Sequence, residues 1–250
     1  MKNRILISPF LALGFLLIIA NSCCKDDDNS PSNPTNGLTM AKFNPHLRYG
    51  SMTDQDGNTY RTIAIGTQTW MAENLRTTKY RNGESIFNIT DNAQWSGLTT
   101  SAYCNYNNTV SLDSIATLGR LYNWYAVSDN RGIAPKGWHI PAEAEWNTLT
   151  AYLGVDSIAS GRLKEASIIQ WGGPDKYTSD NSSGFTALPG GWRWYPNGRF
   201  YHIYYYGSWW SATESDALHV RIISLSDFDA TINRSNGRTG DGYSIRCVKD

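Results

Sequence analysis

Short stretches in which apolar and polar side chains alternate predict most of the strands in this chain. Residues 60–65 form one such stretch, and they follow an Asp56-Gly57 pair that is typical of a hairpin turn. A second turn at residues 66–68 leads into residues 69–71. Further along, glycines separate five more predicted strands, at residues 184–188, 200–204, 207–211, 217–223 and 242–248.

Helical spacing replaces this alternation in the middle of the chain. Pro141 suits the first position of a helix, and Glu143 and Glu145 favour its positive end. The apolar positions that recur at helical spacing are Ala142, Trp146, Leu149 and Leu153. Gly154 ends the pattern, and a second, weaker helix is predicted at residues 157–166.

Two helices flanked by small antiparallel sheets predict an α+β fold. Because strands stand at both ends of the sequence, we expect the two ends of the domain to meet. A length of 250 residues suits one domain of generous size. The prediction is a single domain over residues 45–250.

The N-terminus carries the features of a secretory signal peptide, predicted at residues 1–22. Lys2 and Arg4 precede an apolar run over residues 5–20. That run is shorter than the ~20 residues that a transmembrane helix needs, and Pro9 interrupts it. A single membrane-spanning anchor is the alternative interpretation.

Cys23 stands where cleavage should fall, so this segment resembles a bacterial lipoprotein signal. In that signal the new N-terminal cysteine is acylated and anchors the protein to a membrane, and Cys24 is the alternative lipid site here. The acidic run 26–28 resembles the surface-export signal of Bacteroidetes lipoproteins. A polar stretch with two prolines then predicts a lipid-anchored flexible linker over residues 23–44. We therefore expect an exported protein, anchored in the outer membrane or at the cell surface.

Charge and composition narrow the class of ligand. The chain has 22 basic and 22 acidic residues, and this neutrality argues against nucleic acid, whose binding proteins carry a basic stripe. Ten tryptophans and fifteen tyrosines stand out instead. Their rings pack through a face and hydrogen-bond through an edge, which favours polar, neutral ligands such as sugars.

Cys104 and Cys247 remain if Cys23 carries lipid and Cys24 lies in the linker. Two well-separated cysteines in an exported domain predict a disulfide, which would tie the middle of the chain to its last strand. Two buried free thiols are the alternative. Neither a Cys-x-x-Cys pair nor a His/Cys cluster occurs, so we expect no metal site, and no motif indicates a cofactor.

Several long motifs resemble a family of exported bacterial proteins, the Fibrobacter succinogenes major paralogous domain. The matching motifs are 65–75 (IGTQTWMAENL), 119–127 (GRLYNWYAV), 134–141 (APKGWHIP), 143–146 (EAEW), 188–191 (LPGG), 210–213 (WSAT) and 244–250 (SIRCVKD). Together they cover nearly the whole predicted domain. Residues 140–146 and 245–248 are also similar to formylglycine-generating-enzyme-like domains. This wider resemblance implies a C-type-lectin-like fold, with two helices and a small sheet that pairs the termini.

Neither of the activities that the wider resemblance implies finds its residues here. Formylglycine formation uses a pair of cysteines in the C-terminal half, where this chain has only Cys247. The tripeptides of calcium-dependent lectins are missing. Glu143 and Glu145 point to different faces of one helix and cannot flank one glycosidic bond. His139 lies between apolar neighbours, which favours a packed structural histidine over a general base. We expect no catalysis.

The aromatic segment 191–210 supplies the candidate binding residues. Alternation along a strand turns some of its rings to the core, as expected for Trp210, and their neighbours outward. The expected platform for stacking on a sugar consists of Trp194, Tyr195, Tyr201 and Tyr205, with Arg193 and Arg199 beside the rings. A pair of strands with cross-strand aromatic contacts and no ligand is the alternative interpretation.

The leading functional hypothesis is a non-catalytic surface lipoprotein that binds carbohydrate. A structural or adhesive surface subunit that binds protein partners is the second hypothesis. A divergent enzyme of the formylglycine-generating type is the third.

Overall fold

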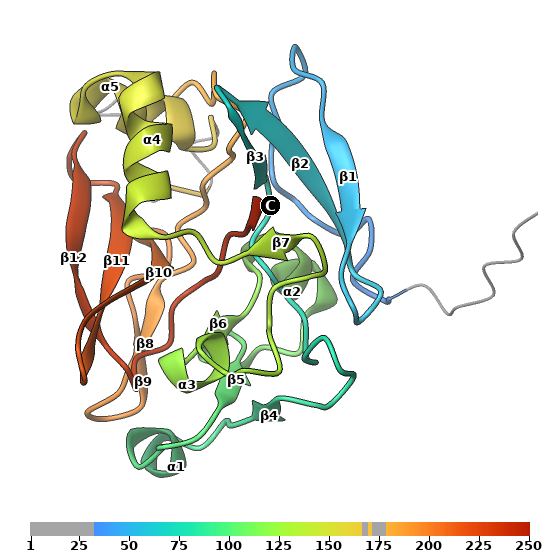
Figure 1. Cartoon of the computed structure of the whole chain (residues 1–250), viewed down its shortest axis with the longest axis vertical. Helices are drawn as coiled ribbons and strands as arrows, with labels where there is room; N and C mark the ends of the chain where they lie inside the picture. The colour runs from blue at the N-terminus through green and yellow to red at the C-terminus, as the bar shows by residue number, and fades with distance from the viewer. Residues whose placement is uncertain (1–32, 167–169, 172–178) are drawn as a thin grey trace, which may run out of the picture. The chain divides into compact units, whose positions relative to one another are not determined.

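A hairpin begins the first sheet, as the alternation predicts. The computed structural model describes residues 33–166, 170–171 and 179–250, so the signal peptide and Cys23 lie outside the described residues. β1 (Gly50–Thr53) pairs with β2 (Thr59–Ile65), and β2 pairs with β3 (Gln68–Met71). β13 (Val248–Lys249) then pairs with β3 on one side and β7 (Trp138–His139) on the other. The last strand therefore lies beside the first hairpin, so the predicted meeting of the domain's ends is confirmed (Figure 1).

A second antiparallel sheet consists of β10 (Tyr206–Asp216), β11 (His219–Ser226) and β12 (Ile232–Arg238). Trp209 and Trp210 are consecutive in β10 and therefore point to opposite faces, and both are fully buried. Both faces of this sheet are thus covered by core. β12 was not predicted, because Ile232 is its only apolar residue and no alternation marks it.

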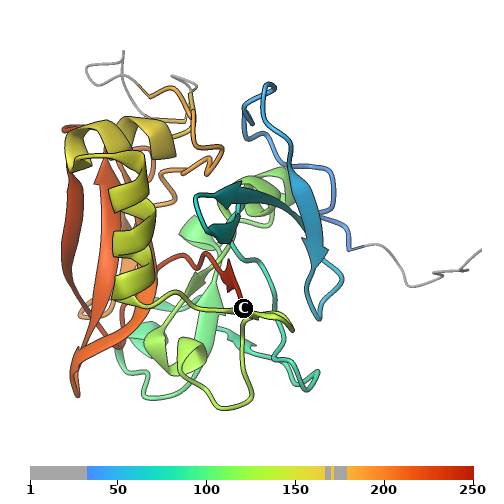
Figure 2. The same ribbon diagram turned by 45° about the horizontal axis from the view of Figure 1, so that its top comes forward.

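α4 (Glu143–Leu153) and α5 (Asp156–Leu163) are the two predicted helices, and they pack on the Trp209 face of the second sheet (Figures 1 and 2). α4 begins at Glu143, two residues after the predicted start at Pro141. The Glu145 carboxylate accepts a hydrogen bond of 2.9 Å from the backbone N–H of Ala142, which satisfies one free donor at the helix start.

The remaining elements are short. They are β4 (Phe87–Asn88), α1 (Asn92–Ser96), β5 (Ala102–Cys104), the 3-10 helix η1 (Tyr106–Asn108), α2 (Leu112–Leu118), β6 (Leu121–Tyr122), α3 (Trp124–Val127), β8 (Trp192–Trp194) and β9 (Arg199–Tyr201). The α+β class is confirmed. The small antiparallel sheets are confirmed as well, although β4 pairs with β5 in parallel. The short helices α1 to α3 come in addition to the two helices that were predicted. Residues 184–188, predicted as a strand, make a single bridge through Ala187.

Residues 33–44 are held against the domain, so the prediction of a flexible linker is wrong for this part of residues 23–44. The Thr35 hydroxyl is 2.8 Å from Nε of Arg76, and Thr35 is buried. The backbone N–H of Met40 donates to the Thr117 hydroxyl at 2.9 Å. These hydrogen bonds join residues that are distant in sequence, and the composition of the stretch gives no sign of them. Composition alone therefore predicts a flexible linker.

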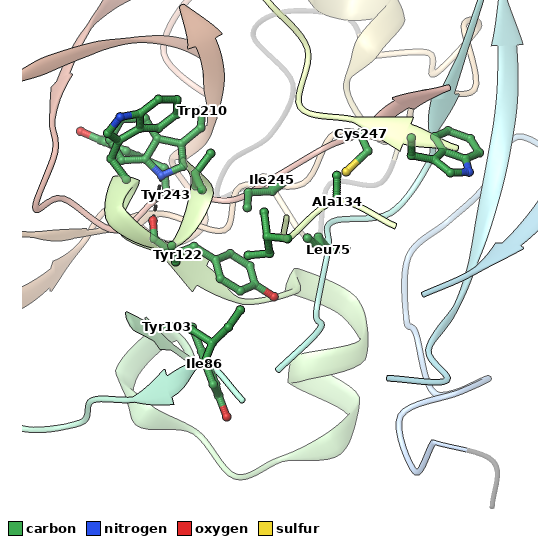
Figure 3. Packing of buried hydrophobic residues seen from close by; sticks show 14 of the residues in the cluster. Leu75, Ile86, Tyr103, Tyr122, Ala134, Trp210, Tyr243, Ile245 and Cys247 are labelled. Atoms are coloured by element: carbon green, nitrogen blue, oxygen red, sulfur yellow. Dashed lines mark hydrogen bonds between the residues drawn. The ribbon is translucent and has the colours of Figure 1, made fainter. Parts of the chain in front are cut away.

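Trp210 lies in the larger core, as predicted. Its indole N–H donates to the backbone oxygen of Tyr122 at 2.7 Å, and its ring meets that of Tyr243 edge to face at 4.8 Å (Figure 3). Figure 3 also shows Ile245 and Cys247 of the C-terminal segment within the same cluster. The family motif around Trp210 is therefore explained by packing.

Arg246 is a fully buried cation whose hydrogen bonds join three parts of the chain. Nε donates to Oδ1 of Asn74 at 2.7 Å, and Nη2 donates to the backbone oxygen of Thr186 at 2.8 Å. Nη1 donates to the backbone oxygens of Met71 and Phe185. Burial lowers the pKa of Arg246, whereas each of these hydrogen bonds favours the charged guanidinium.

Replacing Arg246 with leucine is expected to lower the free energy of unfolding by about 3–5 kcal/mol, because it leaves buried oxygen acceptors without a donor. Urea denaturation of residues 32–250, which form one compact unit, measures the change. Arg199→Ala is the matched control: Arg199 is exposed, so its loss should change stability by no more than about 0.5 kcal/mol. An Arg246→Leu protein as stable as the control contradicts the assignment.

His139 joins β7 to two carboxylates. Nδ1 is 2.7 Å from Oδ1 of Asp250, and Nε2 is 2.8 Å from Oε1 of Glu145. Partial burial lowers the pKa of His139, but the hydrogen bonds to Asp250 and Glu145 and their charges raise it above the ordinary value. The histidine is thus a structural ion-pair partner, although its side chain is 41% exposed and not packed in the core as expected.

This raised pKa predicts a pH-dependent stability. The contribution of His139 is complete below the unfolded-state pKa of 6.5 and is lost as the pH rises through the higher folded-state pKa. Because the groups are exposed, the loss should not exceed about 1 kcal/mol, or about 2–4 °C in Tm. Thermal unfolding from pH 5 to 9 measures it. The difference in Tm between wild type and His139→Gln should shrink with rising pH, and a constant difference contradicts the prediction.

Candidate functional site

The β8–β9 hairpin places neighbouring residues on opposite sides. In its register Trp192 faces Tyr201, Arg193 faces Phe200 and Trp194 faces Arg199. Side chains alternate along each strand, so Arg193 lies on the opposite side of the hairpin from Trp192 and Trp194. Trp192 is partly buried against the larger core, whereas Trp194 is exposed. In Figure 1 this hairpin lies beside β10 to β12, on the other side of the molecule from β1 and β2.

Arg193 is fully buried, so its predicted role as a ligand contact is wrong. Its guanidinium lies 4.4 Å from the ring centroid of Trp95 and 4.7 Å from that of Phe200. Nε donates to the backbone oxygen of Gly198 at 2.7 Å, and Nη1 donates to that of Ile89. Arg193 therefore fastens the hairpin to the segment before α1.

Seven rings follow one another over the hairpin and the turn after it, and we call them the aromatic ribbon. They are Trp192, Trp194, Tyr201, His202, Tyr205, Tyr206 and Phe228. The rings contact one another in the order Trp194, Tyr201, His202, Trp192, Tyr206, Phe228 and Tyr205. The centroids of neighbouring rings in this order lie within 6.1 Å, which is the range of direct ring contacts. The predicted residues Trp194, Tyr201 and Tyr205 belong to this set.

One end of the ribbon is held by edge-to-face and stacked contacts. Trp194 meets Tyr201 at 6.0 Å and 87°, and His202 stacks on Trp192 at 4.7 Å. Trp192 also meets Tyr206 at 5.5 Å and 76°. These contacts fix the rings relative to one another before any ligand arrives, which reduces the entropy lost on binding.

The other end is a flat pair of rings. Tyr205 and Phe228 stack at 5.4 Å with only 3° between their planes, and Tyr206 links them to Trp192. Trp194 and Tyr205 are each 41% exposed, and Phe228 is 55% exposed. The ribbon is therefore a continuous set of aromatic rings, several of which are exposed.

Two predicted residues lie at the margin of the ribbon. Tyr195 is half-buried against Gly240, where even a methyl group would collide with its ring, and its backbone N–H donates to Asp241. Tyr195 is thus part of the support. Arg199 is exposed opposite Trp194 and is the one predicted cation that a ligand can reach.

The turn after β9 holds two non-glycine residues in the left-handed region, His202 at φ +61° and Tyr204 at φ +69°. Such a conformation costs about 1 kcal/mol or more per residue and is concentrated at functional sites. Hydrogen bonds from the N–H groups of Tyr205 and Tyr206 to the backbone oxygen of His202 hold the turn closed. This backbone presents three consecutive tyrosines next to the hairpin.

A hollow of about 240 Å³ opens beside the ribbon, between β8, β10, β11 and β12. Trp192, Tyr206 and Tyr243 line its aromatic side. Asn233 and Ser235 line the polar side, and within the described residues their side chains make no hydrogen bond. The hollow is smaller than the roughly 300–1,000 Å³ of drug-sized sites, so it suits a single ring-sized group.

Asp241 holds the residues around the hairpin and the hollow in place through hydrogen bonds. Its carboxylate accepts from the backbone N–H groups of Tyr195 and Arg238, each at 2.9 Å, and from the Tyr243 hydroxyl at 3.3 Å. Burial raises the pKa of Asp241, although these hydrogen bonds lower it, and burial raises the pKa of Tyr243 as well. Asp241 and Tyr243 are buried, so their role is to support the residues of the site.

The pattern of the sequence predicts three of the seven rings of the ribbon. Alternation from Trp194 implies that Trp192 shares its face, so the sequence carries a signal for this ring as well. His202 lies in a tight turn, where strand alternation does not apply, and Tyr206 begins β10 directly after that turn. Phe228 comes from the loop after β11, and nothing in the sequence indicates that it meets Tyr205.

The predicted disulfide between Cys104 and Cys247 is wrong, because both are free, buried thiols. Cys104 lies in a small cluster with Trp95, whereas Cys247 lies in the larger core with Met71. Burial raises the pKa of Cys104 to about 12 and raises that of Cys247 further. Each cysteine behaves as a small apolar side chain.

The described residues contain no cluster of three His, Cys, Asp or Glu side chains that could hold a metal ion. In the same part of the chain no helix has the length and apolar character needed to cross a membrane. The site itself presents ring faces, amides, hydroxyls and one exposed guanidinium.

The fold is a mixed α+β arrangement of small sheets and short helices. Residues 63–249 match the Fibrobacter succinogenes major domain, and the chain belongs to this family. Searches of the curated proteins and of the solved structures found no match. The predicted family is confirmed, and the ribbon and its hollow lie within the matched residues.

The buried thiols predict that reductant has no effect on the stability of residues 32–250. Because no cross-link is present, dithiothreitol should leave Tm unchanged, and a thiol reagent should modify the cysteines only after denaturation in urea. Ellman's reagent counts the thiols in both conditions. Two thiols in urea and none in the native protein are expected. No thiols in urea, together with a Tm that falls in reductant, contradict the assignment.

Proposed function

We propose that this protein is a non-catalytic surface lipoprotein that binds carbohydrate through the aromatic ribbon. The observation that carries the proposal is the continuous set of fixed, partly exposed rings next to a polar hollow. Sugar rings present apolar C–H faces and polar edges. A ring face on the protein covers the first, and amides or hydroxyls next to it bind the second.

The rings of the ribbon cover the apolar faces of the sugar, and the polar side of the hollow binds its edges. Trp192 and Tyr206 belong to both, so a sugar that enters the hollow and lies against these two rings reaches Asn233 and Ser235. The neighbouring sugars of a chain then lie along Tyr201 and Trp194 in one direction or along Phe228 and Tyr205 in the other. This arrangement favours a polysaccharide over a free monosaccharide.

The location is part of the proposal. A signal peptide over residues 1–22 and lipid on Cys23 would anchor the chain in the outer membrane or at the cell surface, where polysaccharides are met. We also propose a C-type-lectin-like fold, supported by the pairing of β13 with β3 at the ends of the domain and by the two larger helices, α4 and α5.

A protein partner is the second candidate, and one observation favours it. Tyr204 and Tyr205 line a hollow of about 440 Å³ together with Met40, and these three side chains are exposed. An apolar surface of this kind suits an adhesive or structural subunit. The two candidates differ in whether a purified glycan binds.

Affinity gel electrophoresis against a panel of soluble polysaccharides tests the proposal. We expect one class of glycan to retard the wild type, and Trp194→Ala and Tyr201→Ala to bind at least about tenfold more weakly, because each loses a stacking face. Tyr152→Ala is the matched control, since Tyr152 is a 65% exposed ring outside the ribbon, on α4. Thermal unfolding confirms that each variant is folded.

Retardation by no glycan overturns the carbohydrate proposal and favours a protein partner. Equal retardation of Trp194→Ala, Tyr201→Ala and the wild type shows that a glycan binds elsewhere, and it overturns the role of the ribbon.

A further inference from the structure

A third hollow, of about 520 Å³, lies away from the ribbon. One wall is residues 37–49, which we call the strap, and the other is formed by β1, β2 and Glu73. Figures 1 and 2 show the strap, in blue, running beside β1 and β2. The volume falls within the roughly 300–1,000 Å³ of small-molecule sites. The whole strap precedes the residues that match the family.

The strap is fixed on the domain, so the hollow exists without a ligand. Met40 and Asn44 bind Thr117 and Asn181 through hydrogen bonds of 2.9 and 3.1 Å. The backbone N–H of Asn44 donates to the Tyr49 hydroxyl at 3.2 Å, which closes the strap on itself. A site with fixed walls pays little ordering entropy on binding.

Arg61 provides the charge in this hollow. Its guanidinium carbon lies 4.0 Å from the ring centroid of Phe43 and 6.0 Å from that of Tyr49. Within the described residues this guanidinium makes no hydrogen bond and no ion pair. Stacking occupies the face of the guanidinium and leaves its N–H edge free, and this edge matches a carboxylate in a two-point hydrogen bond.

The other charges around the hollow agree with an anionic ligand. Lys42 is exposed on the strap, and its ammonium group has no partner among the described residues. Glu73 carries the one negative charge of the lining, but it is buried. Its carboxylate accepts the backbone N–H of Arg61 at 2.5 Å and lies 3.7 Å from Nη1 of Arg76. The available charge is therefore positive.

The rest of the lining is suited to a sugar. Thr39, Ser51 and Thr59 contribute hydroxyl groups, and Phe43 and Tyr49 contribute rings. A ligand that carries both hydroxyl groups and a carboxylate uses all of these features. An aliphatic or neutral ligand would leave the guanidinium without a counter-charge.

We propose that the hollow under the strap binds a carboxylate-bearing sugar, such as a uronic acid unit of an acidic polysaccharide, with the carboxylate on Arg61. The proposal rests on the proposed function only for the class of ligand, because the site and its residues are separate from the ribbon. The protein then has two glycan sites of different charge preference, a neutral ribbon and an acid-selective hollow.

Isothermal titration of the full chain, purified in detergent, with trigalacturonic acid tests this proposal. The fully methyl-esterified trimer is the neutral probe, and a triglutamate peptide is a carboxylate from a different source. We expect the acid to bind, and the ester and the peptide to bind at least tenfold more weakly. Arg61→Gln should weaken binding of the acid at least tenfold, and Phe43→Leu should weaken it severalfold because the guanidinium loses its stacking support.

Arg48→Gln is the matched control, because Arg48 is an exposed strap arginine that does not line the hollow. It should bind the acid like the wild type, and so should Trp194→Ala, which separates this site from the ribbon. Arg61 is exposed, so its replacement should leave Tm nearly unchanged. This result supports the proposal whether or not the ribbon binds a neutral glycan.

Three results overturn the proposal. One is acid binding that Arg61→Gln leaves unchanged, and another is the absence of acid binding in the wild type. The third is triglutamate binding as tight as that of the sugar acid and dependent on Arg61, which would assign the hollow to a peptide carboxylate. Loss of acid binding in Trp194→Ala but not in Arg61→Gln belongs to the first case and would place the acid on the ribbon.

Discussion

A buried guanidinium needs an oxygen acceptor for its N–H groups, and the way Arg246 meets this need determines how the parts of this fold come together. Its acceptors come from the end of β3, from Asn74 after it, and from the loop at residues 185–186. Oδ1 of Asn74 also accepts the indole N–H of Trp209 at 2.9 Å. One buried network thus connects the closing segment, the first sheet and the second sheet.

The same device recurs at the candidate site, where Arg193 is buried in place of contacting a ligand. Its hydrogen bonds to backbone oxygens hold the β8–β9 hairpin from below, while Asp241 holds the hairpin from its side. The ribbon rings are therefore carried by a rigid support and also contact one another. Rings fixed in this way lose little freedom when they stack on a ligand, so more of the contact energy is available for binding.

The sequence was most informative where a local rule decides the structure. Asp56-Gly57 and the alternation after it located the first hairpin, and the spacing of Trp146, Leu149 and Leu153 located α4. Local rules failed where contacts between residues distant in sequence determine the structure. β12 has one apolar residue and forms because β11 offers it an edge. The disulfide was inferred from compartment alone, which says nothing about where two thiols lie. In the ribbon, Trp194 followed from alternation, whereas Phe228 joins only through the folded chain.

Protection of tryptophan from a quencher tests the central claim, that glycan lies on the ribbon, most directly. Of the ten tryptophans in the chain eight are buried, and the other two are Trp192 and Trp194 of the ribbon. Acrylamide quenching of the native protein therefore reports mainly on the ribbon. We predict that a saturating polysaccharide identified in the gel panel reduces this quenching strongly. A polysaccharide that binds fully and leaves the quenching unchanged would contradict the account.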